Sequence, residues 1–531
     1  MAPAEDFQHG DVPGTILLFD PNHEHGDRTH RGDIVLHPTP SLDPEDPLNW
    51  TRARKHLAVS MVYLYTFTIG ICTAAQYSIL TPISEAQGLT ISQLNIGTGI
   101  MQLMQGWGCL LWQPLAMTYG RRVVYIATIT LSIGPVIWTP FSNGASQWYA
   151  HRILLGIACC PVESLPEVSV PDLFFAHERG KYMALYAFVL FGSNFLAPFL
   201  AGFINDGVGW RWVMYFSTGL LVICSVTMYF FMEETIYFRQ TTEGMDPSSL
   251  RIKTADEEPT TAETPYMQPP KSRLEKLSLI TKLPGRPSDK QMLLKSWRSL
   301  KILVFFPNIL WAAFLYGSNI AWYSVINATI SMILSSEPYG FKPTIVGVCY
   351  LSPLVFGAVS SAWAGNFADS VALKLARRNN GIREPEHRLW GLAIAAIAST
   401  GGLIMWGVGA SLQAHYMVLI MGIGVVTFGV ICASAISLAY AVDCFKEIAG
   451  ESFVGIIVLR NTMGFAFSYA ITPWIEKVGL RDCFISVSVI SLVCTGTFVL
   501  MILWGKNLRR FSADRYWRYV AAERGDTALR H

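Results

Sequence analysis

Charged side chains are scarce in this chain of 531 residues. Asp, Glu, Lys and Arg together make up 15% of it, against about 25% in soluble domains. Hydrophobic residues make up 51%, and the mean hydropathy is +0.35. This composition argues against a disordered chain, a collagen-like repeat and an ordinary soluble enzyme. The formal net charge of +2 is too small to indicate a nucleic-acid partner.

Several kinds of functional motif are also missing. The ten cysteines form no spaced set in a loop, which argues against a disulfide framework. The sequence contains no metal-ligand spacing, no phosphate-binding glycine loop and no nucleophile elbow. We therefore expect no metal, no cofactor, no enzymatic activity and no ATP-driven pump. The first 56 residues are polar and rich in proline, so we expect the first apolar segment, rather than a cleaved signal peptide, to direct the chain to a membrane.

Long uncharged stretches are abundant. A membrane-spanning helix needs about 20 apolar residues, and nine stretches of 21 to 54 residues contain no Asp, Glu, Lys or Arg. The longest, 389–442, must hold two helices, and two further apolar stretches contain embedded charges. The sequence therefore predicts twelve spans, at 57–78, 95–116, 123–142, 150–173, 182–204, 211–231, 303–325, 344–366, 389–409, 416–438, 452–474 and 484–505.

The basic residues give these spans an orientation. With a cytoplasmic N-terminus, 34 of the 40 Lys and Arg residues fall in cytoplasmic segments and four in outside segments. Positive charge favours the cytoplasmic side of a membrane, and an odd number of spans in either half would scramble this distribution. We therefore expect a multi-pass protein of the cell membrane with both termini in the cytoplasm.

A charged segment divides the spans into two sets of six. We predict an all-α membrane protein with a cytoplasmic tail (1–56), a six-helix bundle (57–232), a cytoplasmic linker (233–301), a second six-helix bundle (302–505) and a cytoplasmic tail (506–531). Within the linker, the basic segment 289–301 fits a helix on the membrane surface. Two sets of six spans are typical of a duplicated transporter.

Two motifs carry a family resemblance. Residues 114–122 (PLAMTYGRR) resemble the loop motif G-x-L-x-D-R-x-G-R-R, and residues 191–202 (FGSNFLAPFLAG) resemble the span-five motif G-x-x-x-G-P-x-x-G-G. Segments 42–50, 172–180 and 376–389 are similar to fungal proteins of the same kind. Over residues 42 to about 505 the chain thus resembles the major facilitator superfamily, in its fungal twelve-span drug:proton antiporter branch. The resemblance implies two six-helix bundles around a central cavity and proton-coupled export of a drug-like compound or secondary metabolite.

The resemblance also assigns residues of this chain to positions of the two family motifs, and at some of these positions the residue differs from the family's. The loop motif keeps Gly120, Arg121 and Arg122 but has Met117 in place of the family's Asp, so its charge network is not carried over whole. A similar connector after span eight contains Asp369. Two alanines in the span-five motif replace glycines and still permit close helix packing. The span-five positions are Ala197, Pro198, Ala201 and Gly202.

Buried charges are the sharpest functional candidates. Glu163 lies about 18 Å into span four at 1.5 Å per residue, and an ionisable group inside a membrane is costly and indicates function. Two prolines flank it and should loosen the helix there, and Glu167 follows one turn later on the same face. We expect this pair to carry protons; the alternative is that both lie at the wet cytoplasmic end of the span.

Two arginines are expected to act as a gate or as ties between helices. Arg460 lies about 12 Å into span eleven, close to the depth of Glu163 but in the other half, so the two could form an ion pair that breaks when the halves move apart. The alternative is a structural tie to nearby carbonyls. Arg152 lies at the start of span four, near the outer surface. The alternative to a role as a gate or tie is that its side chain snorkels to water.

The polar and aromatic residues of the spans are less specific. Amides and aromatic rings can contact a ligand or only a neighbouring helix, and among them we expect Gln76, Asn194, Tyr316 and Asn319 to line the cavity. Asn327 begins a glycosylation sequon just outside the predicted span seven.

These features predict secondary transport of a small organic molecule, coupled to protons, by a monomer in a lipid bilayer. One alternative is proton-coupled uptake of an organic cation such as a polyamine, which the two glutamates would suit. Another is a ligand sensor that binds without transport. Outward flux, inward flux and binding without flux distinguish the three.

Overall fold

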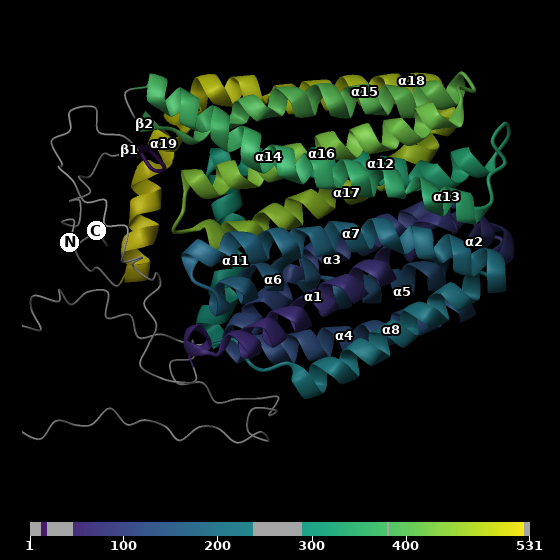
Figure 1. Ribbon diagram of the computed structural model, residues 1–531, viewed down its shortest axis with the longest axis horizontal. Helices are drawn as coiled ribbons and strands as arrows, with labels where there is room; N and C mark the ends of the chain where they lie inside the picture. Colours follow the sequence, from purple (N-terminus) through teal and green to yellow (C-terminus); the bar gives the residue numbers. More distant parts are fainter. Residues whose placement is uncertain (1–11, 18–45, 237–288, 380–381, 525–531) are drawn as a thin grey trace, which may run out of the picture.

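The computed structural model describes residues 12–17, 46–236, 289–379 and 382–524. Figure 1 shows two helical bundles packed side by side, one from each half of the chain. The N-terminal bundle consists of α1 (Arg52–Ala74), α2 (Leu80–Gln87), α3 (Ile91–Tyr119), α4 (Arg121–Trp138), α5 (Gly144–Cys159), α6 (Pro161–Leu173), α7 (Ala176–Val208) and α8 (Trp210–Phe231). The C-terminal bundle consists of α12 (Pro307–Ser335), α13 (Pro343–Cys349), α14 (Leu351–Arg378), α15 (Leu392–Ser411), α16 (Tyr416–Cys444), α17 (Ala449–Val478), α18 (Leu480–Gly496) and α19 (Phe498–Arg524).

Short elements complete the described chain. Helix α11 (Asp289–Phe305) precedes α12 and packs against both α17 and α3, so this predicted surface helix contacts both bundles. Four 3₁₀ helices, η1 to η4, cover Pro47–Asn49, Ala75–Ser78, Thr139–Phe141 and Pro385–Gly391. Within the described ranges, the only strands are β1 (Ile16–Leu17) and β2 (Ile382–Arg383), which pair antiparallel. The all-α prediction is therefore confirmed.

The spans agree closely with the uncharged stretches. In the part of the chain that the structure describes, eleven segments are long and apolar enough to cross a membrane. The remaining predicted span, 95–116, is α3, which has the required length of 29 residues. Amide side chains lower the hydropathy of this helix. Two of them, Gln102 and Gln105, line the cavity between the bundles, where polar groups are tolerated.

Proline interrupts span four at the predicted place. Helix α5 ends at Cys159, and α6 begins at Pro161. A proline fits the first turn of a helix because its missing N–H would have no partner there. The backbone N–H of Glu163 donates to the carbonyl of Cys160 at 3.3 Å. The break therefore gives Glu163 a place in the first turn of a new helix.

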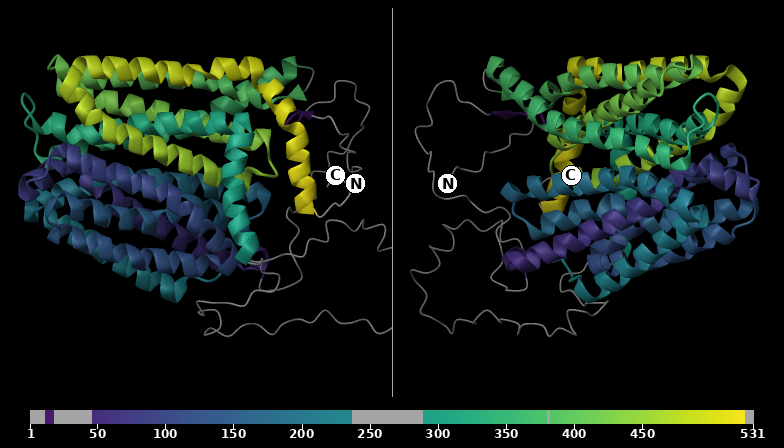
Figure 2. Two further views of the ribbon diagram at one scale, coloured as in Figure 1. Left: turned by 180° about the vertical axis from the view of Figure 1, so that it is seen from behind. Right: turned by 45° about the vertical axis from the view of Figure 1, so that its right-hand side comes forward.

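The molecule has two different ends. We call the end at which α1 begins and α19 lies the α19 end, and the opposite end, which carries α2 and α13, the α13 end (Figures 1 and 2). At the α13 end, one cluster of buried side chains draws on both bundles, with Leu80 from α2, Trp322 from α12 and Val346 from α13. Farther toward the α19 end, two large clusters each lie within one bundle. The bundles are therefore packed together most extensively at the α13 end.

Candidate functional site

A cavity of about 130 Å³ lies between the two bundles. Its walls come from α1, η2, α3, α6 and α7 of one bundle and from α12, α16 and α17 of the other. Aromatic rings and amide side chains make up ten of its 22 lining residues, and such a mixture of apolar and polar groups is typical of sites for small organic molecules. The aromatic and amide residues are Tyr77, Phe191, Phe195, Tyr316, Tyr323, Gln102, Gln105, Asn194, Asn327 and Asn461.

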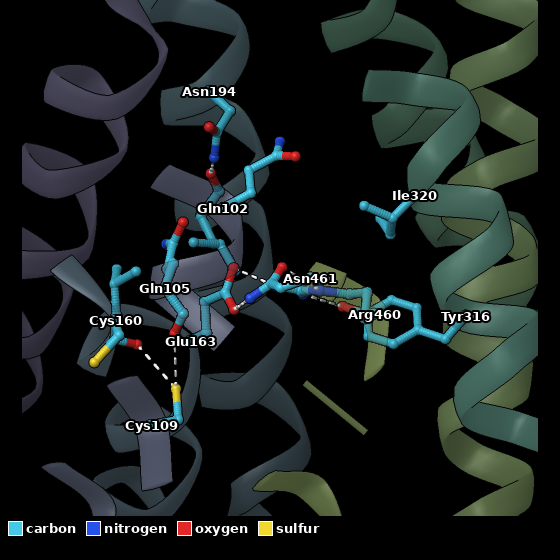
Figure 3. Close-up of polar contacts among 12 residues, drawn as sticks. Gln102, Gln105, Cys109, Cys160, Glu163, Asn194, Tyr316, Ile320, Arg460 and Asn461 are labelled. Carbon is cyan, nitrogen blue, oxygen red and sulfur yellow. Dashed lines mark hydrogen bonds and ion pairs between the residues drawn. The ribbon is translucent and has the colours of Figure 1, made fainter. Parts of the chain in front are cut away.

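An ion pair crosses from one bundle to the other at this cavity. Glu163 of α6 pairs with Arg460 of α17, as Figure 3 shows, and their side chains are 13% and 9% exposed. Asn461 supports both partners: its Nδ2 donates to Glu163 Oε2 at 2.9 Å, and its Oδ1 accepts from Arg460 Nη2 at 2.9 Å. Arg460 Nη1 donates to the Tyr316 hydroxyl at 2.8 Å. The contact expected between the two buried charges is present.

The α13 end is held closed by polar contacts between the bundles. The hydroxyls of Thr81 and Ser331 lie 2.9 Å apart. Asn95 Nδ2 donates to the carbonyl of Ala328 at 3.1 Å and to the hydroxyl of Thr472 at 3.2 Å. All three contacts join the N-terminal bundle to α12 or α17. Together with the cluster of buried side chains that the two bundles share at this end, they separate the cavity from the α13 end.

The span-five motif contributes to the same closure. Pro198 and Gly202 lie on the face of α7 that packs against α13. A Cβ on Gly202 would lie 2.4 Å from the carbonyl oxygen of Pro343, and one on Gly347 would lie 2.6 Å from that of Pro198. Only glycine permits such an approach at both positions. The neighbouring Ala197 and Ala201, each 1% exposed, are buried with them.

The ion pair lies on the opposite side of the cavity, toward the α19 end. Helix α3 runs from the α13 end to the α19 end, and along it Gln102 is followed by Gln105 and Cys109. In Figure 3, Glu163 lies level with the segment between Gln105 and Cys109, whereas Asn194 lies beyond Gln102. The cavity is thus bounded by the closed α13 end and by the Glu163–Arg460 pair.

The two other predicted charges do not join this pair. Glu167 lies one turn beyond Glu163 but does not line the cavity, and its Oε2 is buried without a partner among the described residues. Arg152 is 2% exposed, with its guanidinium carbon 4.4 Å from the ring centre of Trp148. Its Nε and Nη2 have no partner in the described ranges. The snorkelling alternative for Arg152 is therefore wrong, because its side chain turns into the bundle.

The loop motif forms contacts within the N-terminal bundle at the α19 end. Arg121 Nε donates to Asp172 Oδ2 at 3.0 Å, and its Nη1 donates to the sulfur of Met117 at 2.9 Å. Arg122 is 1% exposed, and its Nε donates to the carbonyl of Met232 at 2.7 Å. Both arginines are therefore held within their own bundle, although methionine stands where the family has aspartate.

Glu234, which sequence reasoning missed, completes this network. Its carboxylate accepts the backbone N–H groups of Arg121 and Arg122 at 2.9 and 3.1 Å, beside Gly120 at the start of α4. A carboxylate at a helix N-terminus satisfies N–H groups that have no partner inside the helix. Burial raises the pKa of the Glu234 carboxyl, and hydrogen bonds from backbone N–H groups partly offset that rise. Asp369 lies in α14, and its side chain is outside the described residues.

The predicted lining residues divide into two groups. Tyr316 and Asn194 line the cavity. Gln76 and Asn319 do not. The amide of Gln76 donates to the Thr98 hydroxyl at 3.0 Å, and that of Asn319 donates to the carbonyl of Leu315 in its own helix at 2.9 Å. Each is buried within one bundle.

The placement of Asn327 outside span seven is wrong. Helix α12 continues to Ser335, ten residues past the predicted end of that span at 325. Asn327 is 3% exposed, lines the cavity and accepts a hydrogen bond from the Tyr350 hydroxyl at 3.1 Å. A buried amide inside the bundle cannot be reached by a glycosylating enzyme.

Comparisons with known proteins agree with this architecture. A family model described as the Major Facilitator Superfamily matches residues 62–469. An uncharacterised MFS-type transporter of Schizosaccharomyces pombe is 28% identical, over 96% of this chain and 94% of its own length. Protein HOL1 of Saccharomyces cerevisiae is 26% identical, over 96% and 97%. A trichosetin biosynthesis cluster MFS transporter of Gibberella fujikuroi is 24% identical, over 89% and 88%.

One solved structure matches the fold. It is a partially occluded inward open conformation of the xylose transporter XylE from Escherichia coli. The TM-score is 0.56 at 12% sequence identity, and the match covers 84% of this chain and 98% of the other. At this identity the likeness concerns the fold alone.

Proposed function

The chain belongs to the major facilitator superfamily, and on that premise we propose that it exports a small organic molecule in exchange for protons. Its fold and its relatives identify it as a multi-pass membrane transporter. In this proposal it works as a monomer in the cell membrane. Both termini lie in the cytoplasm, because basic residues are concentrated in the segments on that side. The α19 end is then cytoplasmic, and the α13 end faces outward.

The observation that carries the proposal is the ion pair between the bundles. Glu163 and Arg460 belong to different bundles and meet at the cavity. Separation of the bundles at the α19 end must break this pair, whereas the contacts of Thr81 and Asn95 at the α13 end can persist. A cavity of about 130 Å³ is small for a drug-sized molecule, since ligand pockets commonly measure about 300–1,000 Å³. The cavity must therefore enlarge to admit such a cargo, and for a cargo that enters from the cytoplasm the bundles must separate at the α19 end.

Protons enter the mechanism through Glu163. Protonation removes the negative charge that holds Arg460, so it weakens the contact between the bundles and favours the state that is open at the α19 end. Glu167 supplies a second carboxyl group one helical turn away, and its unpartnered Oε2 suits a temporary proton acceptor. In this scheme Asn461 and Tyr316 keep Arg460 in place while the carboxyl group changes its charge.

The class of cargo follows from the lining and from one relative. Aromatic rings and amides fit a flat molecule with hydrogen-bonding groups. The trichosetin cluster relative makes a secondary metabolite a reasonable cargo. A second candidate, proton-coupled uptake of an organic cation, is favoured by the carboxylate of Glu163 and the ring of Tyr323 at the same cavity.

Purified protein in sealed vesicles distinguishes these functions. Candidate cargoes are taken from compounds whose distribution between cells and medium changes when the gene is removed. Export predicts movement of cargo against an imposed proton gradient, with protons moving in the opposite direction. Accumulation in the same direction as protons would support uptake, and saturable binding without flux would support a sensor and overturn transport.

A further inference from the structure

Residues 12–17 lie against the C-terminal bundle, although they precede α1 of the N-terminal bundle. Figure 1 shows β1 beside β2 and α19, away from the start of α1. Ile16 pairs with Arg383, and Leu17 pairs with Ile382, in an antiparallel register. Strand pairing of this kind is a common way for a protein surface to bind an extended peptide.

A tight turn precedes the strand. The backbone N–H of Thr15 donates to the carbonyl of Val12 at 3.4 Å, and Gly14 has a φ of +82°. Proline at the second position and a glycine with positive φ at the third are typical of a type II turn, and the sequence here is Val12-Pro13-Gly14-Thr15. The sequence thus favours the bound shape before docking, which lowers the entropy lost on binding.

Arg509 of α19 holds this turn. Its side chain is fully buried, and its Nε and Nη2 donate to the two carboxylate oxygens of Glu386 at 2.9 and 2.6 Å. Its Nη1 donates to the carbonyl of Pro13 at 2.6 Å and to the hydroxyl of Thr15 at 3.2 Å. Glu386 therefore fixes the guanidinium in a position from which its third nitrogen, Nη1, reaches the turn of residues 12–15.

The surface also selects for glycine. A Cβ on Gly14 would lie 2.5 Å from the backbone oxygen of Asp443 and 3.0 Å from the Cα of Cys444, both at the end of α16. Asp443 is itself held by an ion pair with Arg388 at 3.3 Å. Neighbouring backbone cannot move aside as the tip of a flexible side chain can, so a larger residue at position 14 must weaken the contact.

We propose that the C-terminal bundle carries a peptide-binding site whose ligand is the chain's own segment 12–17. The bound segment is a strap that attaches the N-terminus of the chain to the bundle that α1 does not belong to. The 28 residues between Leu17 and Asp46 can span up to about 90 Å when extended. Chain length therefore does not impose the docked position, which depends on the contacts of Pro13, Gly14 and Thr15.

A free peptide should accordingly replace the strap. The probe is a fluorescent synthetic peptide covering residues 8–20, and the target is the full chain lacking residues 1–17, purified in detergent. We expect saturable binding to this deletion variant and at least tenfold weaker binding to the intact chain, whose site is occupied. The same peptide with Gly14→Val should bind at least tenfold more weakly, and a scrambled peptide should not bind.

A second variant keeps the test open if the deletion impairs folding. Gly14→Val in the full chain should release the strap and allow the wild-type peptide to bind. Equal affinity of the wild-type and Gly14→Val peptides, or no binding to either variant, would overturn the proposal. Equal binding of the peptide to the intact chain would also contradict it, because the site would then not be filled by the strap.

Discussion

The exchange of Glu163 for glutamine isolates the charge of the ion pair between the bundles. Glutamine keeps the size of the side chain and an oxygen that can still accept from Asn461, whose Nδ2 lies 2.9 Å from Glu163 Oε2. It removes the negative charge opposite Arg460. We expect Glu163→Gln to shift the protein toward the state in which the bundles are apart at the α19 end.

The size of the shift follows from the burial of the pair. Removal of one partner from a dry ion pair costs about 3–5 kcal/mol. Here the side chains are 13% and 9% exposed, and Arg460 keeps Tyr316 and Asn461 as acceptors. We therefore use about 1.5–3 kcal/mol, which corresponds to a shift of roughly 10- to 100-fold in the ratio of the two states at about 1.4 kcal/mol per tenfold.

Distances between spin labels can measure this ratio. Lys181 near the start of α7 and Lys446 after α16 are exposed residues at the α19 end of opposite bundles. Both are replaced by cysteine in a Cys494→Ser background, since the other nine cysteines are buried. Glu163→Gln should increase the population with the longer distance.

Glu167→Gln is the matched comparison for the distance measurement, because it removes a carboxylate from the same helix, one that accepts no hydrogen bond at Oε2 from the described residues, and leaves the pair of Glu163 and Arg460 in place. A charge swap provides a second check: Glu163→Arg combined with Arg460→Glu should restore part of the original distribution. The reasoning is refuted if Glu163→Gln leaves the distances unchanged, or if Glu167→Gln has the same effect as Glu163→Gln.

Three further predictions concern closure, topology and modification. Gly347→Val should prevent closure of the α13 end and abolish transport at normal surface abundance, since a Cβ would lie 2.6 Å from the Pro198 oxygen; Gly219→Val, where nothing lies within 4 Å, is the control. Full activity of Gly347→Val would contradict this packing. Tags in 254–270 and after His531 should be inaccessible to antibody in intact cells. Labelling of either tag would contradict the cytoplasmic assignment of that segment. Glycosidase treatment should leave the electrophoretic mobility unchanged, because Asn327 is buried. A faster band after treatment of the wild-type protein, absent after treatment of Asn327→Gln, would show that Asn327 is glycosylated.

The architecture could be predicted because it depends on patterns that run along the chain. Uncharged stretches mark the spans, since charge is costly in a bilayer, and proline marks the break before Glu163. Depth along a helix also placed Glu163 and Arg460 at similar levels, and these residues do meet.

The details of the site depend on helix rotation and on residues distant in sequence, which such patterns do not specify. Asn319 and Tyr316 are one turn apart on α12, yet only Tyr316 lines the cavity. Tyr77 lies in the 3₁₀ helix η2, where the chain leaves the regular α-helix. The direction of its side chain therefore does not follow the period of an α-helix. Glu234 was missed because its partners are backbone N–H groups more than 100 residues earlier.

Transport by Glu163→Gln in sealed vesicles tests the central claim most directly. Wild-type protein should drive its cargo against the concentration gradient when a pH gradient is imposed. Glu163→Gln should lose this pH-driven transport but still exchange labelled for unlabelled cargo, because the variant keeps the cavity and loses only the change of charge. Unchanged pH-driven transport by Glu163→Gln, at equal protein abundance, would contradict the assignment of Glu163 as the proton carrier.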